Sequence, residues 1–255
     1  MNVWDRYAER TSAKASNRDT IIDRTQKYIA NKIKDSASYF NVKIDSANQS
    51  VAIINTDNLN EKYIYSLPGE DIVHGATVEW AGNHWLITEK DASNEVYTRA
   101  KMLQCNYLLR WIDKDSLIHE QWCVIEDGTK YLTGEFSDRD FITTRGDSRL
   151  AMIIGKNEHT AKFSRSCRFI IDDDDSESML AYELTKPYKL GGTYNGKGVY
   201  KFVLQEVNTT DYDNKELRIA DYYRYYPAES NDVDNGHAVI SPDSNKNEFG
   251  REVWL

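Results

Sequence analysis

YFNVKID, residues 39–45, decides the fold class, because its apolar and polar side chains strictly alternate. Successive side chains of a β-strand point to opposite faces, so this alternation predicts a strand with one buried face. Phe40, Val42 and Ile44 form that face. A polar turn, SANQS (46–50), leads from this strand to the next apolar segment.

Similar segments continue to residue 113. They are VAIIN (51–55), KYIYSL (62–67), TVEWA (77–81), HWLIT (84–88) and the alternating run from Leu103 to Trp111. Gly82-Asn83 is a two-residue hairpin signal between the third and fourth of these segments. We interpret the run from Leu103 to Trp111 as one long strand. Residues 39–113 then form a small β-barrel or sandwich of about six strands.

One convincing helix precedes the strands. In TIIDRTQKYIANKI (20–33), Ile22, Tyr28 and Ile33 recur roughly along one helical face. Asn17 or Asp19 can cap its amino end, and the segment is long enough for about four turns. The first ten residues, which carry Trp4 and Tyr7, are compatible with a further short helix.

A second β-rich region follows residue 115. LIHEQWCVIE (117–126) and KYLTGEF (130–136) flank an Asp127-Gly128 turn and predict a hairpin. Later strand candidates are RLAMII (149–154), CRFII (167–171), MLAYELT (179–185), GVYKFVLQE (198–206) and LRIADYYRYY (217–226). Residues 228–250 have too little apolar content to fold alone and predict an extended tail.

The segments therefore predict a mainly β protein with four parts. These are an N-terminal helical segment (1–38), a first β-barrel or sandwich (39–115), a second β-rich domain (116–207), and a C-terminal strand with an extended tail (208–255).

Composition narrows the function classes. The chain has 17 Tyr and 6 Trp, residues that are enriched at protein interfaces. Its net charge of −9 argues against gripping a phosphate backbone, although residues 1–43 carry +4 (nine basic, five acidic). No stretch approaches the roughly 18 apolar residues of a membrane helix, and the charged amino end does not resemble a signal peptide. We expect a cytosolic chain with three reduced cysteines.

Three local motifs resemble functional sites, and we interpret each as structural. His119-Glu120-x-x-Cys123 resembles a zinc-protease motif, but that motif needs a helix and this segment alternates like a strand. Asp172 to Glu183 has calcium-loop spacing, but Glu177 stands where the sharp turn needs glycine. Gly191 to Gly198 is followed by a strand and not by the helix of a phosphate-binding loop, so it predicts a loop or bulged hairpin.

These motifs, together with the absence of a local nucleophile signature such as GxSxG, indicate that the chain is not an enzyme. We expect no catalytic residues, no bound metal and no cofactor.

Read together, the segments resemble the head-closure proteins of long-tailed phages of Gram-positive bacteria, also called neck, stopper or head–tail connector proteins. The resemblance covers about residues 1–225 and rests on patterned positions and segment order. Its first half is carried by SYFNVKID, VAIIN, KYIYSLPGEDIVHGATVEWAGNHWLITEKD and CNYLLRWID. Its second half is carried by TKYLTGE, GDSRLAMIIGKNEHT, RSCRFIIDD, LAYELT, GKGVYKFVLQE and KELRIADYY.

This resemblance implies a virion protein of the phage neck, assembled in the host cytoplasm. It implies a homo-oligomeric ring of roughly six or twelve copies, whose contacts join two different patches of each subunit. The implied neighbours are a portal or adaptor protein and a tail-terminator or tail-tube protein. Packaged DNA would pass through without sequence-specific binding, and no membrane would be involved.

The family has no catalytic residues to transfer, so the interface candidates come from the residues themselves. They are Trp4, Tyr7, Ile22 and Tyr28 on the helix face; Pro68, Gly69, Glu70 and Asp71 in a loop; and Tyr222, Tyr223, Tyr225, Tyr226, Trp254 and Leu255 in the C-terminal part. The helix face is expected to cover the core of the first barrel, and the loop has an ordinary turn as its alternative. A weakly apolar tail that ends in Trp-Leu gains order by docking on a partner.

Three other functions stay open. A tail-tube or baseplate subunit is also β-rich and ring-forming, and a carbohydrate-binding β-module uses exposed Trp and Tyr side chains. A hydrolase would require a cluster of titratable groups in one cleft, assembled only in three dimensions.

Overall fold

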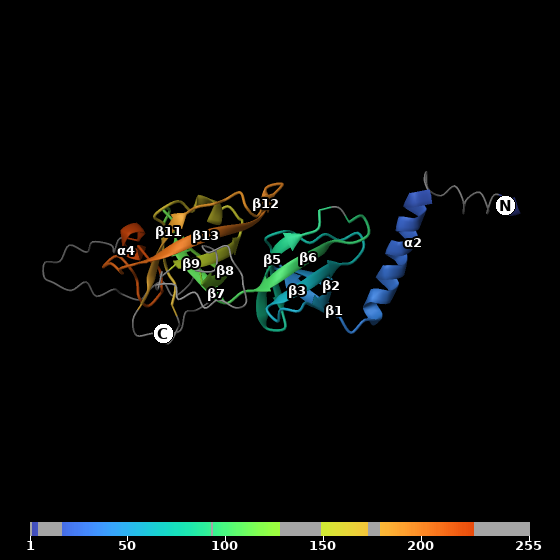
Figure 1. Ribbon diagram of the computed structural model, residues 1–255, viewed down its shortest axis with the longest axis horizontal. Coiled ribbons are helices and arrows are strands. Elements are labelled where there is room, and N and C mark those ends of the chain that lie inside the picture. The colour runs from blue at the N-terminus through green and yellow to red at the C-terminus, as the bar shows by residue number, and fades with distance from the viewer. Residues whose placement is uncertain (1, 5–16, 93, 128–148, 173–178, 227–255) are drawn as a thin grey trace, which may run out of the picture. The chain divides into compact units, whose positions relative to one another are not determined.

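The computed structural model describes residues 2–4, 17–92, 94–127, 149–172 and 179–226 (Figure 1). The chain divides into two compact units. The first comprises Met1–Asn106 and Leu190–Tyr200, and the second comprises Tyr107–Lys189 and Lys201–Leu255. The fold is mainly β, with an N-terminal helix, a closed barrel and a second, barrel-like sheet, which confirms the predicted fold class.

Helix α2 (Asn17–Lys32) begins the described part of the first unit and continues into the short 3-10 helix η1 (Ile33–Asp35). The predicted helix is confirmed, but none of its residues is buried. The expectation that its apolar face covers the barrel core is therefore wrong. Polar contacts tie the helix to the loop before strand β6 (Arg99–Gln104). Arg18 lies 2.8 Å from the Glu95 carboxylate, and the Gln26 amide donates to the Glu95 carbonyl oxygen at 2.9 Å.

Six antiparallel strands close the barrel of the first unit. They are β1 (Tyr39–Ile44), β2 (Ala47–Asn55), β3 (Glu61–Ser66), β4 (Thr77–Trp80), β5 (Asn83–Lys90) and β6 (Arg99–Gln104). Their order is β1-β2-β3-β6-β5-β4, and β1 pairs with β4 at Ile44 and Val78 to complete the ring. Inward side chains such as Val51, Ile64 and Met102 are fully buried and form one core.

Two turns of the barrel lie slightly earlier than the sequence predicts. The β4–β5 hairpin turns at Ala81-Gly82, both with positive φ, so that Asn83 already pairs with Trp80. The β1–β2 turn is Asp45-Ser46, also with positive φ, and β2 begins at Ala47. Turns in which both central residues have positive φ match the twist of the flanking strands, so these positions satisfy hairpin geometry.

The predicted single strand from Leu103 to Trp111 is wrong. The chain forms two strands there, β6, which ends at Gln104, and β7 (Tyr107–Ile112), and they belong to different sheets. The Cys105 amide still bonds to the His84 carbonyl oxygen at 2.8 Å, after which the chain leaves the barrel. A two-residue link preserves the period-2 alternation, which is why the sequence pattern does not show the break.

The sheet of the second unit has the order β10-β11-β13-β9-β8-β7. Its strands are β7, β8 (Ile118–Asp127), β9 (Arg149–Gly155), β10 (Arg168–Ile170), β11 (Ala181–Lys186) and β13 (Lys197–Val207), of which the last belongs to this unit from Lys201 onwards. The short 3-10 helix η2 (Thr160–Lys162) follows β9. The segments predicted around 149–154, 167–171, 179–185 and 198–206 are thus confirmed as strands. Tyr200, Phe202 and Leu204 are all buried on one face of β13, as their alternation predicts. The predicted partner strand at 130–136 lies outside the described residues.

The glycine-rich stretch Gly191–Gly198 forms a hairpin, which confirms the prediction. The short strand β12 (Thr193–Tyr194) pairs with the start of β13, and the chain turns at Asn195-Gly196. Glycine is required at Gly198, which has φ +136° and leaves no room for a side chain against the Gly192 carbonyl oxygen. The stretch therefore serves backbone geometry.

The predicted C-terminal strand at 217–226 is also wrong. Arg218 and Asp221 have positive φ, Asn214 forms an isolated bridge with Ile219, and α4 (Tyr222–Tyr225) is a single helical turn. A left-handed residue breaks the extended conformation that the aromatic and apolar side chains favour. The predicted tail beyond residue 226 lies outside the described residues.

Candidate functional site

The predicted helix-face candidates are partly exposed. Trp4 is 73% exposed and Tyr28 is 65% exposed, whereas Ile22 is half-buried. Ile21, which the periodicity does not single out, is 63% exposed and adds to the apolar surface of α2. Tyr7 lies outside the described residues. The helix thus offers apolar side chains that the described part of its own chain does not bury.

The loop from Pro68 to Asp71 is an ordered turn. Gly69 has φ +86°, and the Glu70 amide bonds to the Leu67 carbonyl oxygen at 3.1 Å. Asp71 accepts hydrogen bonds from the Lys90 ammonium (2.6 Å) and the Thr98 hydroxyl (2.9 Å). Burial alone would raise the pKa of Asp71, but these bonds outweigh it, so the pKa lies below its usual value. The loop therefore has a structural explanation within the first unit.

The C-terminal tyrosines form a cluster on the second unit. Tyr222 contacts Tyr223 edge-on at 5.2 Å and stacks on Tyr226 at 5.4 Å between ring centroids. The Ser116 hydroxyl donates to the carbonyl oxygen of Tyr225 and anchors α4 to the β7–β8 turn. Tyr226 is partly exposed. Trp254 and Leu255 lie outside the described residues.

The second unit contains a cavity of about 600 Å³ beside this cluster. Polar and charged side chains gather on its walls, and several belong to the two groups described next. The lining includes Trp111, Asp113, Asp115, His159, Lys162, Phe163, Ser164, Arg165, Cys167, Arg168, Asp221, Arg224 and Tyr225.

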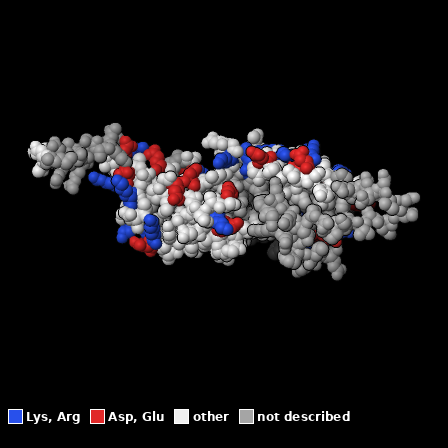
Figure 2. Space-filling view, turned by 180° about the vertical axis from the view of Figure 1, so that it is seen from behind, with Lys and Arg blue, Asp and Glu red and all other residues white. Residues whose placement is uncertain are grey.

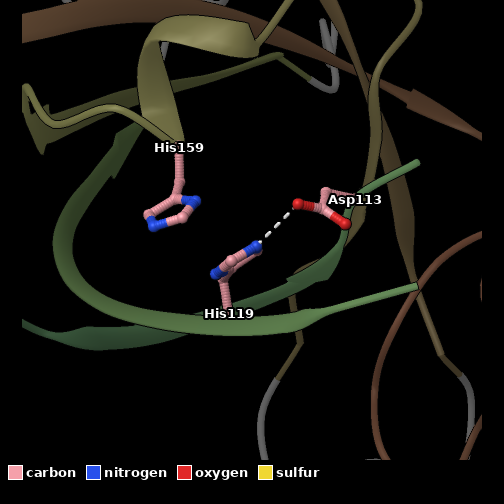
Figure 3. Close-up of side chains that lie close together, drawn as sticks. All are labelled: Asp113, His119 and His159. Carbon is pink, nitrogen blue, oxygen red and sulfur yellow. Dashed lines mark hydrogen bonds and ion pairs between the residues drawn. The ribbon is translucent and has the colours of Figure 1, made fainter. Parts of the chain in front are cut away.

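Asp113 and His159 line this cavity, and His119 lies close to both of them. One ring nitrogen of His159 is turned towards Asp113 (Figure 3). His119 Nε2 lies 3.0 Å from Asp113 Oδ2, and the two imidazole rings lie 3.9 Å apart between centroids. One candidate ligand atom from each residue lies within 4.8 Å of the others. Nδ1 of His159 is buried and has no hydrogen-bond partner among the described residues. Within the part of the chain that the structure describes, these three side chains form the group that could hold a metal ion.

The turn after β7 holds the Asp113 carboxylate in place. Its Oδ1 accepts hydrogen bonds from the backbone amides of Asp115 (2.9 Å) and Leu117 (3.1 Å). Burial alone would raise the pKa of Asp113, but the His119 hydrogen bond and these amides outweigh it and lower the pKa. Asp113 is therefore an anion that faces His119.

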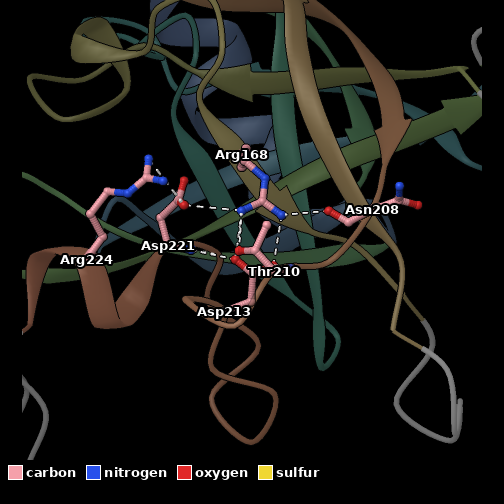
Figure 4. A network of polar contacts seen from close by, with 6 residues as sticks. All are labelled: Arg168, Asn208, Thr210, Asp213, Asp221 and Arg224. Atoms are coloured by element: carbon pink, nitrogen blue, oxygen red, sulfur yellow. Dashed lines mark hydrogen bonds and ion pairs between the residues drawn. The ribbon is translucent and has the colours of Figure 1, made fainter.

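Arg168 is the centre of a second polar network (Figure 4). Its guanidinium makes a bidentate contact with Asp213, at 2.9 and 2.8 Å, and a further contact with Asp221 at 3.2 Å. It also donates to the Thr210 hydroxyl and the Asn208 carbonyl oxygen. Burial alone would lower the pKa of Arg168, but the two carboxylates outweigh it and raise the pKa. The network fixes residues 208–221, which have little regular secondary structure, to strand β10.

The hydroxyl and thiol groups of the cavity do not form a nucleophile–base pair. Ser164 and Cys167 contact each other, with Oγ and Sγ 3.6 Å apart. Among the described residues, no hydroxyl or thiol hydrogen-bonds to the side chain of His119 or His159. A hydrogen bond to a general base is one of the ways in which a protein activates a nucleophile. Titratable groups thus gather beside this cavity, as the hydrolase alternative requires.

Of the interface candidates predicted from the sequence, Tyr225 lines this cavity and the other described candidates do not. His119 stood out through the zinc-protease motif, but its spatial partners are Asp113 and His159 and not Glu120 or Cys123. The strand interpretation of that motif is confirmed, since His119 lies in β8. The calcium-type spacing falls partly outside the described residues, and Glu183 lies within β11. No local motif connects His119 with a residue 40 positions later.

Charged side chains are mixed over the face of the described residues seen in Figure 2, and no single basic patch dominates that view. No helix among the described residues is both long and apolar enough to cross a membrane.

Comparisons with known proteins give one family match. Residues 13–104 match the model of the YomX N-terminal domain, a phage-type family of the Bacillus phage SPbeta-like kind. The match covers α2 and the whole six-stranded barrel, and it suggests a phage protein. No curated protein matches.

A solved structure described as MrkH, a c-di-GMP-dependent transcription regulatory factor, aligns with 78% of this chain and 86% of its own, at 11% identity. Its TM-score of 0.23 is too low to support an argument about fold or function.

Proposed function

We propose that this chain is a structural protein of a phage virion, a ring subunit of the neck that joins the head to the tail. The observation that carries the proposal is the match of residues 13–104 to a phage-type domain. The order of the β segments along the chain, which resembles that of head-closure proteins, supports the more specific assignment to the neck. In this proposal the chain performs no catalytic step and needs no cofactor.

Helix α2 supports a role in subunit contacts. Ile21 and Tyr28 are each more than half exposed, and a helix whose apolar side chains stay outside its own core is typical of an interface element. In a closed ring, a patch of one subunit meets a different patch of the next. We assign the α2 face to this contact, together with the Tyr222–Tyr226 cluster.

Charge supports passive passage of DNA. The net charge is −9, and acidic and basic side chains are interspersed on the face in Figure 2. Binding to a phosphate backbone requires clustered Lys and Arg that release counterions. A ring of such subunits would let packaged DNA pass without gripping it. Its neighbours would be a portal or adaptor protein on one side and a tail-terminator or tail-tube protein on the other.

Loss of the protein from the phage that encodes it separates the candidate functions. A neck subunit is needed only to join finished parts, so its absence should leave separate heads and complete tails in electron micrographs. A tail-tube subunit would instead leave no tails, and a baseplate subunit would leave tails without a complete tip. Expression of the wild-type chain from a plasmid should restore joined particles.

Immunogold labelling gives an independent location. Label at the head–tail junction of intact or disrupted virions is the expected result. Label along the tail or at its tip would move the chain to the tube or baseplate. No label on disrupted particles would contradict a virion role altogether.

The interface assignment has a matched pair of variants. Tyr28→Asp places a charge on the apolar face of α2, whereas Asn31→Asp adds the same charge at another exposed position of the helix. We expect Y28D to reduce the yield of joined particles at least tenfold and N31D to have little effect, because burying an unpaired charge in an interface is costly. Equal yields for the two variants would contradict the α2 assignment.

A further inference from the structure

We propose that Asp113, His119 and His159 bind a divalent transition-metal ion, with zinc as the best fit, at the wall of the cavity in the second unit. This inference is independent of the proposed function. It rests on the convergence of one carboxylate and two imidazoles, and on a buried ring nitrogen of His159 that has no partner among the described residues.

The donor set fits zinc and disfavours hard cations. Imidazole nitrogen and carboxylate oxygen are ordinary zinc ligands, whereas calcium and magnesium take oxygen ligands almost exclusively. Two histidines with one carboxylate also leave a fourth tetrahedral position for water or another ligand. The adjoining cavity of about 600 Å³ provides space for that ligand.

The distances are close to those that a zinc ion requires. Ligand bonds of about 2.0–2.1 Å in a tetrahedron place the ligand atoms roughly 3.3 Å apart. His119 Nε2 and Asp113 Oδ2 already lie 3.0 Å apart, and all three ligand atoms lie within 4.8 Å. Metal binding would replace the His119–Asp113 hydrogen bond with two metal bonds and draw the half-buried His159 ring inwards.

The surrounding structure holds each ligand in position. Backbone amides of the β7–β8 turn fix Oδ1 of Asp113, so that Oδ2 faces the histidines. The Asn157 side chain accepts from the His159 amide at 3.0 Å and donates to Gln121 on β8 at 2.8 Å. The loop that carries His159 is thereby tied to the strand that carries His119. Hydrogen bonds of this kind, made by groups around the ligands, orient metal ligands.

Nearby charges set the strength of binding. Asp115 adds a second carboxylate at the cavity, while the Lys162 ammonium lies 3.7 Å from Asp113 Oδ2 and competes with a cation for it. Because Lys162 is more than half exposed, it can turn towards solvent when a metal ion arrives. The ion would connect the β7–β8 turn to the segment before η2, and it would stabilise the second unit.

The test uses the full chain without a histidine tag, freed of metal by a chelator and titrated with zinc chloride in a calorimeter. We expect one zinc ion per chain, no comparable binding of magnesium, and a rise in Tm on the order of 5 °C at a hundredfold excess over Kd. His159→Gln should weaken binding at least about tenfold, whereas His84→Gln, a histidine of the first barrel, should leave it unchanged. No zinc binding, or equal binding by the wild type and H159Q, would overturn the proposal.

A second measurement on the wild type needs no variant. Cobalt(II) bound at this site should show the visible absorption of a tetrahedral ion with nitrogen and oxygen ligands. Intense near-ultraviolet bands from cobalt–thiolate bonds would place the metal on the cysteines and would overturn the assignment to Asp113, His119 and His159.

Discussion

The two units of this chain complete their sheets in different ways. In the first unit, backbone pairing between β1 and β4 closes the barrel, and the core behind it is a continuous apolar cluster. In the second unit, the end strands β7 and β10 are joined by a side chain, because the Tyr107 hydroxyl donates to the Ile170 carbonyl oxygen at 3.0 Å. The irregular segment after β13 is held by the Arg168 network.

This difference separates two sources of stability. A closed barrel has no free edges and derives its stability from apolar burial. A sheet completed by side chains depends on particular polar groups whose loss leaves buried partners unsatisfied. Both units bury apolar side chains, among them Phe169 and Phe202 in the second. The second unit should nevertheless respond more strongly than the first to changes in charge, hydrogen bonding and pH.

The largest effect should come from Arg168. Arg168→Met leaves Asp213, whose side chain is only 1% exposed, without its cation. Removing one partner of a buried ion pair costs about 3–5 kcal/mol. Hydrogen exchange read by mass spectrometry should show faster opening of the second unit, with the barrel peptides unchanged. The control, Arg165→Met, alters an exposed arginine and should cost less than about 0.5 kcal/mol. Equal costs for the two variants would contradict a special role for the network.

A core truncation should have the converse effect on the barrel. Ile64 is fully buried between strands β2 and β6, and Ile64→Ala should lower the free energy of unfolding of the first unit by about 2–5 kcal/mol. Ile54 lies on β2 with nearly half of its surface exposed, so Ile54→Ala should cost less than about 1 kcal/mol. Chemical denaturation checks both values. A larger cost for I54A than for I64A would mean that the core has been assigned to the wrong face.

Acid should destabilise the second unit first. Burial alone would raise the pKa of Asp213, but Arg168 and the backbone amides of Asp221 and Thr210 outweigh it and hold the pKa below its usual 3.8. A carboxyl whose pKa is lower in the folded state than in the unfolded state stabilises the fold at pH values above its unfolded-state pKa. That stability is lost as the pH falls through its folded-state pKa. Asp71 in the first unit shifts in the same direction, but its exposed side chain is screened by solvent.

We therefore expect the second unit to lose protection from hydrogen exchange below about pH 3.8, before the barrel does. Simultaneous loss in both units would contradict this order. In Arg168→Met the acid sensitivity of the second unit should be reduced, because the group that lowers the pKa of Asp213 is gone.

The smallest effect should come from the hydroxyl that links β7 to β10. Tyr107→Phe removes the hydroxyl that donates to the Ile170 carbonyl oxygen and should cost about 0.5–1.5 kcal/mol. Tyr63→Phe removes the corresponding hydroxyl from barrel strand β3. Because backbone pairing closes the barrel, this change should have a smaller effect. Thermal unfolding of the two variants is a direct comparison of the two modes of closure. A cost for Y63F as large as that for Y107F would remove the distinction.

Much of the local structure follows from residue order alone. Alternation in YFNVKID and in GVYKFVLQE predicts β1 and β13 because strand geometry has a period of two residues, whatever the strand pairs with. The helical period of about 3.6 residues likewise predicts α2 from the spacing of Ile22, Tyr28 and Ile33. Such prediction fails where the local signal is ambiguous. Leu103 to Trp111 keeps its alternation across a change of sheet, and LRIADYYRYY forms turns because Arg218 and Asp221 adopt left-handed backbone conformations.

Only the tertiary structure decided what these elements contact. The exposure of the α2 face depends on how the helix lies beside its barrel, which side-chain periodicity does not encode. The meeting of Asp113 and His119 with His159, and of Arg168 with Asp213, joins residues about 40 positions apart or more. Local propensity acts over a few residues, whereas such contacts depend on strand order and register, which are properties of the whole sheet. The sequence by itself determined a mainly β chain, and the packing of that chain determined where its polar groups meet.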